Sequence, residues 1–186
     1  EIQERYYELA LTNYETKYMF ENLVLDWFAE DSASYNGFVR SLLNGDLKAM
    51  NAYMNRVSKS MFSSFDGGNR PSDETHPERF YHGFVLGLLV ELADRYVVTS
   101  NRESGFGRYD VLMEPKSKDY DGIILEFKVH DPEDEKDLQE TVQSALRQIK
   151  ERQYGQILLD HGLKHHHIRS YGFAFEGKKV LIGEGE

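Results

Sequence analysis

Three short apolar segments in the second part of the chain most restrict what it can fold into. They are rich in β-branched and aromatic residues and are separated by turn-forming residues, which is typical of β-strands. The segments are YVVTSN (96–101), RYDVLME (108–114) and GIILEFKV (122–129). The sequence therefore predicts a sheet within residues 96–129.

A helix is predicted on either side of these strands. The segment THPERFYHGFVLGLLVELADRY (75–96) has apolar residues at four-residue intervals and on more than one side, which is typical of a helix packed against a sheet. Asp131 and Pro132 suit the N-cap and first position of the next helix, and the acids behind them complement its positive end. The apolar stripe of that helix is Leu138, Val142, Ala145 and Ile149.

The chain ends in a predicted hairpin that turns at Glu176 and Gly177. Its second part therefore runs helix, three strands, helix, two strands. This order predicts the α/β class.

The first part of the chain is predicted to be helical. One helix is expected at residues 11–30 and another at 44–62, with Asp46 as the cap of the second. Glycines, a proline and small polar residues then interrupt the pattern. We therefore expect a helical segment at 1–75 and a separate domain at 76–186.

Composition excludes several classes of protein. The 186 residues include no cysteine, which excludes disulfides, thiol nucleophiles and cysteine-bound zinc. No apolar run is long enough to cross a bilayer, so we expect a cytoplasmic protein with no membrane partner. The net charge of −10 argues mildly against a nucleic-acid partner, although basic groups gather toward the C-terminus and leave room for a local basic face. Since the sequence begins with Glu1, we expect a fragment of a longer protein; no oligomeric state is indicated.

Charged residues interrupt two of the apolar strands. Asp110 lies in one, and Glu126 and Lys128 share a face of another because side chains alternate along a strand. A symmetric hairpin around residues 115–121 sets Asp110 opposite Glu126. Facing carboxylates repel and are costly to bury, so we expect a divalent cation, Mg²⁺ or Mn²⁺, between them. With Lys128 alongside, this pattern is typical of phosphate-ester hydrolysis.

The combination of an acidic strand, Glu-x-Lys on the next strand and flanking helices resembles the PD-(D/E)XK nuclease superfamily. The resemblance implies a restriction-endonuclease-like αβββαβ core, a mixed sheet flanked by helices, here preceded by a small helical segment. Other stretches are similar to a bacterial branch in which this domain follows an AAA-ATPase-like domain, and together they cover residues 76–180. They are FYHGFVLGLL, SNRESGFGRYD, IILEFK, and ALRQI with Tyr154 after it.

The resemblance also implies a set of site residues. These are the metal ligands Asp110, Glu126 and, through its main-chain carbonyl, Phe127; the catalytic Lys128; the metal-assisting Glu78; and the helical Gln148. The chain has Tyr109 before Asp110 where the family pattern has proline, a departure that the superfamily often shows.

Three more residues are candidates because they flank this constellation. Glu103 and Arg108 come before Asp110, and we expect Glu103 to be functional and Arg108 to bind phosphate through its fork of donors. His82 lies one helical turn after Glu78 and would share its face, so it is a second candidate for substrate binding.

Plainer interpretations stand beside each of these. The two strand acids and Lys128 would form a salt-bridge cluster on an exposed sheet face. Glu78 would belong to a capping box with Thr75. His82 would be a hydrogen-bonded core residue, and Gln148 would be a polar residue at the edge of the apolar stripe of its helix. Glu103 and Arg108 would belong to a hairpin loop. We interpret the triple histidine at 165–167 as a solvated loop and the acidic run DPEDEKD as a solvated helix start.

The main hypothesis is a Mg²⁺- or Mn²⁺-dependent nuclease that cleaves DNA or RNA beside an AAA-ATPase-like domain of the same chain. One alternative is a binding module that has the fold without the reaction, and another is a purely structural module of the ATPase-like domain. The choice between DNA and RNA, and between ends and interiors, stays open.

Overall fold

The structure is a computed structural model, and it describes residues 32–65, 77–100, 103–104, 107–108 and 110–185. The helix predicted at residues 11–30 lies outside the described residues. Contacts divide the chain into two compact units, Glu1–Asn36 and Gly37–Glu186. The second unit contains all of the described elements except the first residues of helix α2 (Ser32–Asn44), which begins within the first unit.

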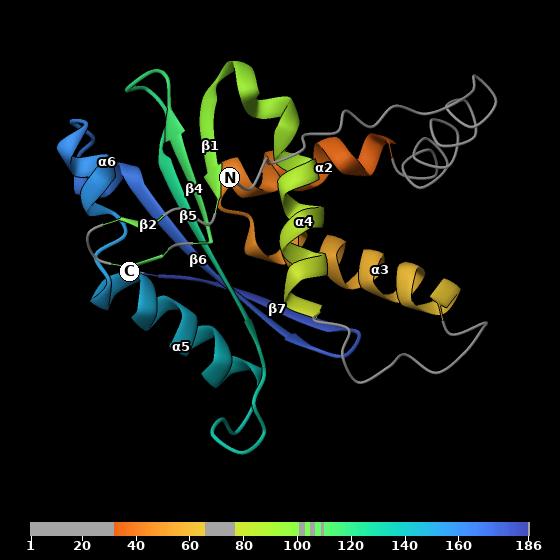
Figure 1. Cartoon of the computed structure of the whole chain (residues 1–186). Coiled ribbons are helices and arrows are strands. Elements are labelled where there is room, and N and C mark those ends of the chain that lie inside the picture. The colour runs from red at the N-terminus through yellow and green to blue at the C-terminus, as the bar shows by residue number, and fades with distance from the viewer. Residues whose placement is uncertain (1–31, 66–76, 101–102, 105–106, 109, 186) are drawn as a thin grey trace, which may run out of the picture. The chain divides into compact units, whose positions relative to one another are not determined.

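A five-stranded mixed sheet is the centre of this unit (Figure 1). Its strand order is β1-β4-β5-β6-β7, in which β5 and β6 are parallel and the other neighbours are antiparallel. Strands β2 and β3 form a separate two-stranded ladder. The strands are β1 (Tyr96–Ser100), β2 (Glu103–Ser104), β3 (Gly107–Arg108), β4 (Val111–Pro115), β5 (Gly122–Val129), β6 (Ile168–Glu176) and β7 (Lys179–Glu184).

Helices α4 and α5 pack on opposite faces of the sheet. On one face, the ring of Tyr81 in α4 stacks on Phe175 with centroids 4.1 Å apart. On the other face, Gln148 of α5 reaches Glu126. The helices are α2 (Ser32–Asn44), α3 (Leu47–Phe65), α4 (Pro77–Leu89), α5 (Leu138–Glu151) and α6 (Gln156–Asp160), with 3₁₀ turns η1 (Val90–Asp94) and η2 (His165–His167).

The edge strand β7 is covered by helix α3. The amide of Asn51 donates to the carbonyl of Ile182 (2.9 Å) and accepts from its N–H (2.8 Å). Asn55, one helical turn on, makes the same pair of bonds with Val180 at 2.6 and 3.1 Å. Four residues along a helix and two along a strand span similar lengths, so the two asparagines replace a neighbouring strand. Helix α3 thereby satisfies backbone groups that an open edge would expose.

Two of the predicted elements differ in detail from the structure, and a third has the predicted cap. The strand expected at 108–114 is two strands, because β3 ends at Arg108 and β4 begins at Val111. The C-terminal hairpin turns one residue later than expected: Glu176 pairs with Lys179, and Gly177 occupies the left-handed region at φ 55°. Helix α3 has the predicted cap, since Asp46 Oδ1 accepts from the N–H of Ala49 at 3.0 Å.

The predicted fold class is confirmed. Helix α4, strands β1, β4 and β5, helix α5 and strands β6 and β7 follow the αβββαβ order, with one strand more at the end. The compact unit begins at Gly37, so α3 packs with the sheet, while the proposed division at residue 75 stays a prediction. Within the described residues, no helix has the length and apolar character needed to span a membrane.

Candidate functional site

Asp110 lies where the chain passes from the β2–β3 ladder into the main sheet. The β4–β5 register pairs Val111 with Leu125, as the symmetric hairpin predicts, and one further step sets Asp110 across from Glu126. Asp110 Oδ2 accepts a hydrogen bond from the N–H of Phe127 at 2.8 Å. The carboxylate thus takes the place of a strand carbonyl in the ladder, and this bond fixes it beside β5.

Glu126 is buried in the middle of strand β5, with 3% of its surface exposed. Its Oε1 accepts a hydrogen bond from Nε2 of Gln148, and the same nitrogen lies 3.3 Å from the hydroxyl of Tyr154. A buried carboxylate is costly unless hydrogen bonds or positive charge stabilise it. The exposed salt-bridge cluster considered from the sequence is therefore wrong for Glu126.

Both carboxylates are close enough to Tyr154 for their charges to affect its pKa. Burial raises the pKa of Tyr154, the hydrogen bond from Gln148 opposes the rise, and the negative charges of Glu126 and Asp110 add to it. Gln148, expected either at a functional position or at the edge of a stripe, lies in contact with Glu126.

Phe127 and Lys128 complete the strand portion of the site. The N–H and C=O of one residue in an antiparallel ladder point to the same neighbouring strand, so the carbonyl of Phe127 faces the side of Asp110. Its ring lies on the opposite face of the sheet, 4.9 Å from the ring of Phe173. Lys128 is half-buried and shares the face of Glu126.

These side chains border one cavity of about 590 Å³. Five of the predicted site residues line it: Asp110, Glu126, Phe127, Lys128 and Gln148. Seven residues that were not predicted also line it: Val129, Asp131, Asp134, Glu135, Glu140, Ser144 and Arg147. Ser144 and Glu140 precede Gln148 by four and eight residues, and Arg147 follows Ser144 by three, so extending this face along the helix from Gln148 would have found them.

His82 lies elsewhere. Its Nε2 is 2.9 Å from the hydroxyl of Ser100 and 3.2 Å from the main-chain oxygen of Asp110, and its ring is 5.5 Å from that of Phe127. These contacts match the plainer interpretation of a hydrogen-bonded core histidine. His82 supports the chain that carries Asp110 and does not line the cavity.

For three candidates only the backbone is described. Glu78 lies in the first turn of α4, whereas Glu103 and Arg108 pair with each other across the β2–β3 ladder. In one continuous strand, Arg108 would share the face of Asp110 because the two are two residues apart, but the break between β3 and β4 removes that basis for a role in phosphate binding. Thr75, the expected partner of Glu78 in a capping box, lies outside the described residues.

The acidic run after β5 forms a loop, so the expected helix start is wrong. We call residues 131–137 the acidic loop. Helix α5 begins at Leu138, with Asp137 as its N-cap accepting from the N–H of Glu140 at 3.0 Å. Asp131 instead closes a turn, since its Oδ1 accepts from the N–H of Glu133 at 2.9 Å. An aspartate followed three residues later by glutamate is itself a capping pattern, and Asp137 and Glu140 would have given the correct start.

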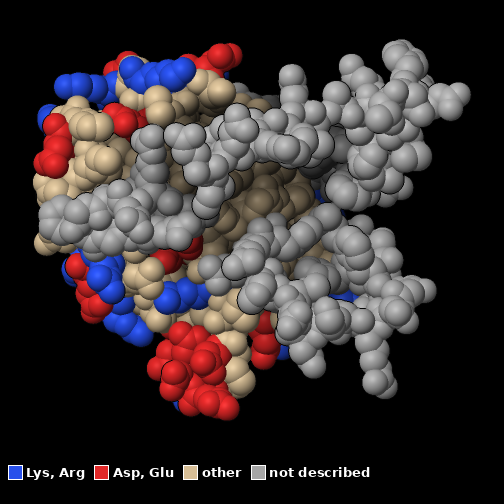
Figure 2. Space-filling model, in the orientation of Figure 1, with Lys and Arg blue, Asp and Glu red and all other residues tan. Residues whose placement is uncertain are grey.

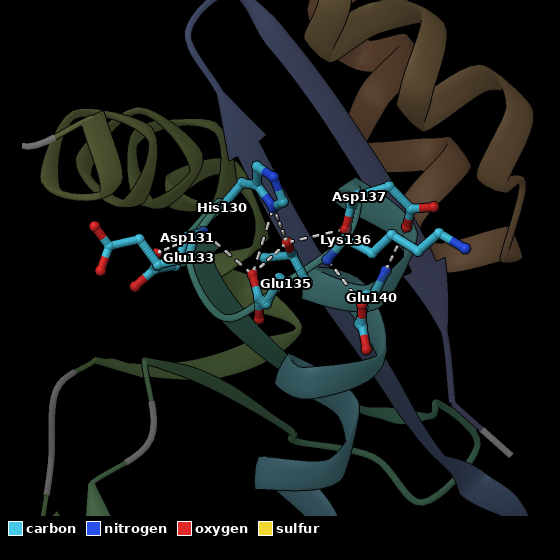
Figure 3. A network of polar contacts seen from close by, with 8 residues as sticks. His130, Asp131, Glu133, Glu135, Lys136, Asp137 and Glu140 are labelled. Atoms are coloured by element: carbon cyan, nitrogen blue, oxygen red, sulfur yellow. Dashed lines mark hydrogen bonds and ion pairs between the residues drawn. The ribbon is translucent and has the colours of Figure 1, made fainter.

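A partly buried polar network around Thr141 holds the acidic loop against α5 (Figure 3). The hydroxyl of Thr141 donates to Oε2 of Glu135 at 2.6 Å and lies 2.9 Å from Nδ1 of His130. Burial raises the pKa of Glu135, but hydrogen bonds from Thr141 and the Asp131 amide, with the charges of His130 and Lys128, bring it below its ordinary value. Glu135 is thus held as a carboxylate that ties the loop to the helix.

The cavity is predominantly negative. Six of its twelve lining residues are acidic and two are basic, and Figure 2 shows acidic side chains gathered at the lower edge of the view, where Figure 1 places the chain between β5 and α5. Oxygen donors of this kind suit Mg²⁺ or Mn²⁺. The carboxylates of Asp110 and Glu126 and the carbonyl of Phe127 have the chemistry of the expected ligand set, and the three residues line the same cavity.

In the described part of the chain, no group of three or more histidine or acidic side chains is arranged to hold a metal ion, in the cavity or elsewhere. The triple histidine forms the short turn η2, in which His167 pairs with Asp121 at 2.8 Å.

Comparisons with known proteins agree with the geometry. A family model described as the PD-(D/E)XK nuclease superfamily matches residues 76–185, more than half of the chain. Searches of the curated proteins and of the solved structures each found no match.

Proposed function

Because the chain belongs to the PD-(D/E)XK nuclease superfamily, we propose that its cavity is the site of a Mg²⁺- or Mn²⁺-dependent nuclease that hydrolyses phosphodiester bonds in DNA or RNA. The observation that carries the proposal is the convergence of Asp110, Glu126, Phe127 and Lys128 on one cavity. When bound there, the metal would polarise a phosphate oxygen and lower the pKa of a water molecule.

Each of these site residues has a physical role in the proposed reaction. Asp110 is held toward β5 by the amide of Phe127, and Glu126 is held by Gln148, so both carboxylates are oriented before substrate arrives. The ammonium group of Lys128, on the face of Glu126, would stabilise negative charge that develops on the phosphate or on the attacking oxygen. Burial of Glu126 strengthens these electrostatic interactions because little water screens them.

The test is a cleavage assay with labelled single- and double-stranded DNA and RNA over a titration of Mg²⁺ and Mn²⁺. We expect metal-dependent cleavage that falls at least roughly a hundredfold in Asp110→Asn, Glu126→Gln and Lys128→Met. Lys150→Met, which removes an exposed lysine of α5, is the matched control and should cleave normally. Calorimetry with Mn²⁺ should show binding lost in Asp110→Asn and kept in Lys128→Met. Tight Mn²⁺ binding by a protein that cleaves none of the four substrates would refute the proposal.

A nuclease-fold binding module is the second candidate, and the acidic lining of the cavity favours it, because negative charge opposes the approach of a polyanion. This candidate predicts that Mn²⁺ leaves the melting temperature unchanged. It also predicts that Asp110→Asn does not change the affinity of the protein for any ligand that it binds. A rise in melting temperature with Mn²⁺ that Asp110→Asn abolishes favours the nuclease.

We also propose that the domain works beside an AAA-ATPase-like domain in a longer chain of a bacterial, cytoplasmic protein. The support is the similarity of the stretches around Tyr81, Asp110, Glu126 and Gln148 to that branch of the superfamily. In the full-length protein, ATP should change the cleavage rate. Equal rates with ATP, with a non-hydrolysable analogue and with neither would count against it.

A further inference from the structure

One glycine lies directly beside the buried carboxylate of the site. In the parallel β5–β6 ladder, Gly172 pairs with Glu126. Paired residues of adjacent strands face the same side of a sheet, so both are directed toward helix α5. No side chain at position 172 separates the sheet from the helix.

The helix lies so close to Gly172 that a methyl group does not fit. A Cβ atom there would lie 2.9 Å from the main-chain oxygen of Val142, 3.1 Å from Cβ of Ala145 and 3.3 Å from Cγ of Leu146. A main-chain oxygen cannot move aside by rotating a side chain, so the helical turn itself would have to shift. Gln148 stands one turn after Ala145 on the same helix, and it makes the hydrogen bond to Glu126.

We propose that Gly172 is a positioning residue of this site: its missing side chain lets α5 approach the sheet closely enough for Gln148 to hold Glu126. A side chain at position 172 lifts the turn at Val142 and Ala145 and carries Gln148 away from the carboxylate. The consequence for catalysis rests on the proposed function, whereas the contact between Gln148 and Glu126 can be measured without it.

Gly183 offers a matched control. It pairs with Gly172 across the β6–β7 ladder and also lies under Val142, but a Cβ there would meet Cγ1 of that side chain at 2.6 Å. The close atom belongs to a side chain and not to the helix backbone, and the position is one strand farther from Glu126. Gly183→Ala therefore crowds the same helix through a side chain and not by direct contact with its main chain.

The direct test is the side-chain amide of Gln148 in a ¹⁵N–¹H correlation spectrum of the metal-free protein, assigned by its loss in Gln148→Ala. A proton donated to a carboxylate is deshielded, so we expect this signal to move toward that of solvent-exposed glutamines in Gly172→Ala and to stay in place in Gly183→Ala. An unchanged signal in folded Gly172→Ala overturns the proposal. If Gly172→Ala does not fold, Ala145→Ser enlarges the same contact from the helix side, and an unchanged signal there overturns it equally.

Kinetics give the second readout in a double-mutant cycle. Loss of a hydrogen bond to a charged group predicts a fall in kcat of roughly tenfold in both Gly172→Ala and Gln148→Ala, with no further fall when they are combined. Multiplying effects would mean that Gly172 acts only through general stability. If the wild-type protein cleaves no nucleic acid, the proposed function fails, while the spectrum still decides whether Gly172 positions Gln148.

Discussion

The two walls of the cavity are built in different ways. Glu126 and Gln148 stand on a sheet and a helix whose contact surfaces are buried, whereas the acidic loop is mostly exposed and is tied down by Glu135 and His130. The first wall is fixed by close packing of apolar groups, and the second by a few polar contacts. The difference shows which parts of the site depend on the core and which depend on charge and pH.

The largest effect on stability is expected at Ile124, which lies two residues before Glu126 and on the same face of β5. Ile124 is 1% exposed and packs in a cluster with Leu112, Ile149, Tyr154 and Leu158. Removing most of a buried side chain leaves a cavity, so Ile124→Ala should lower the free energy of unfolding by about 2–5 kcal/mol. Urea denaturation measures it.

The control for that prediction is on the same strand. Val129 is 41% exposed and borders the cavity beside the acidic loop, so Val129→Ala should cost less than about 1 kcal/mol. Equal losses in the two variants would mean that the walls do not differ in their dependence on packing.

The same contrast explains what the sequence could predict. Hydrophobic periodicity located β5 and the buried stripe of α5, because each side chain on that wall is set by the period of its own element. Alternation and a symmetric hairpin then predicted the register that sets Asp110 across from Glu126. The close approach of α5 depends on Gly172, a residue that carries no signal until the neighbouring strand and helix are known.

The acidic loop was misread for a related reason. Asp131 and Pro132 have the residue types of a helix start, but two patterns of that kind follow one another, and the network around Thr141 selects Asp137. That network joins residues on both sides of the loop through partly buried hydrogen bonds, which local propensity does not encode. The break before Val111 was missed similarly, since it depends on the pairing of β2 with β3.

A pH series tests how far the acidic loop depends on the charge of Glu135. Its folded-state pKa is lowered, so its stabilising contribution is fully present above about 4.5, the ordinary value, and is lost as the pH falls through the lower folded pKa. Since Glu135 is 14% exposed and accepts a charge-assisted hydrogen bond, Glu135→Gln should cost about 1 kcal/mol at pH 7. Thermal unfolding from pH 7 to pH 3 should show the difference from wild type shrinking below pH 4.5.

The exposed Glu151 of α5 provides the control, because Glu151→Gln removes an equal charge outside the network and should change stability little at any pH. A difference between wild type and Glu135→Gln that stays constant down to pH 3 would show that the loop is not held by the ionised carboxylate. Because Ile124 is an apolar residue of the buried wall, the loss of stability in Ile124→Ala should not vary with pH in this way.

The smallest expected effect comes from a single charge on the acidic loop. Asp134 lines the cavity, so in a nuclease its carboxylate would repel the phosphates of a bound strand. Asp134→Asn should therefore raise kcat/KM about two- to fivefold at low salt. Screening shortens the range of this repulsion to about 10 Å at 0.1 M salt, so the gain should fade as salt is added. Glu133→Gln removes the same charge from the same loop at a residue outside the cavity lining, and it should give a smaller gain. If the two variants respond equally, the loop acts through its total charge and not as a wall of the site, and the distinction between the walls then applies to stability alone.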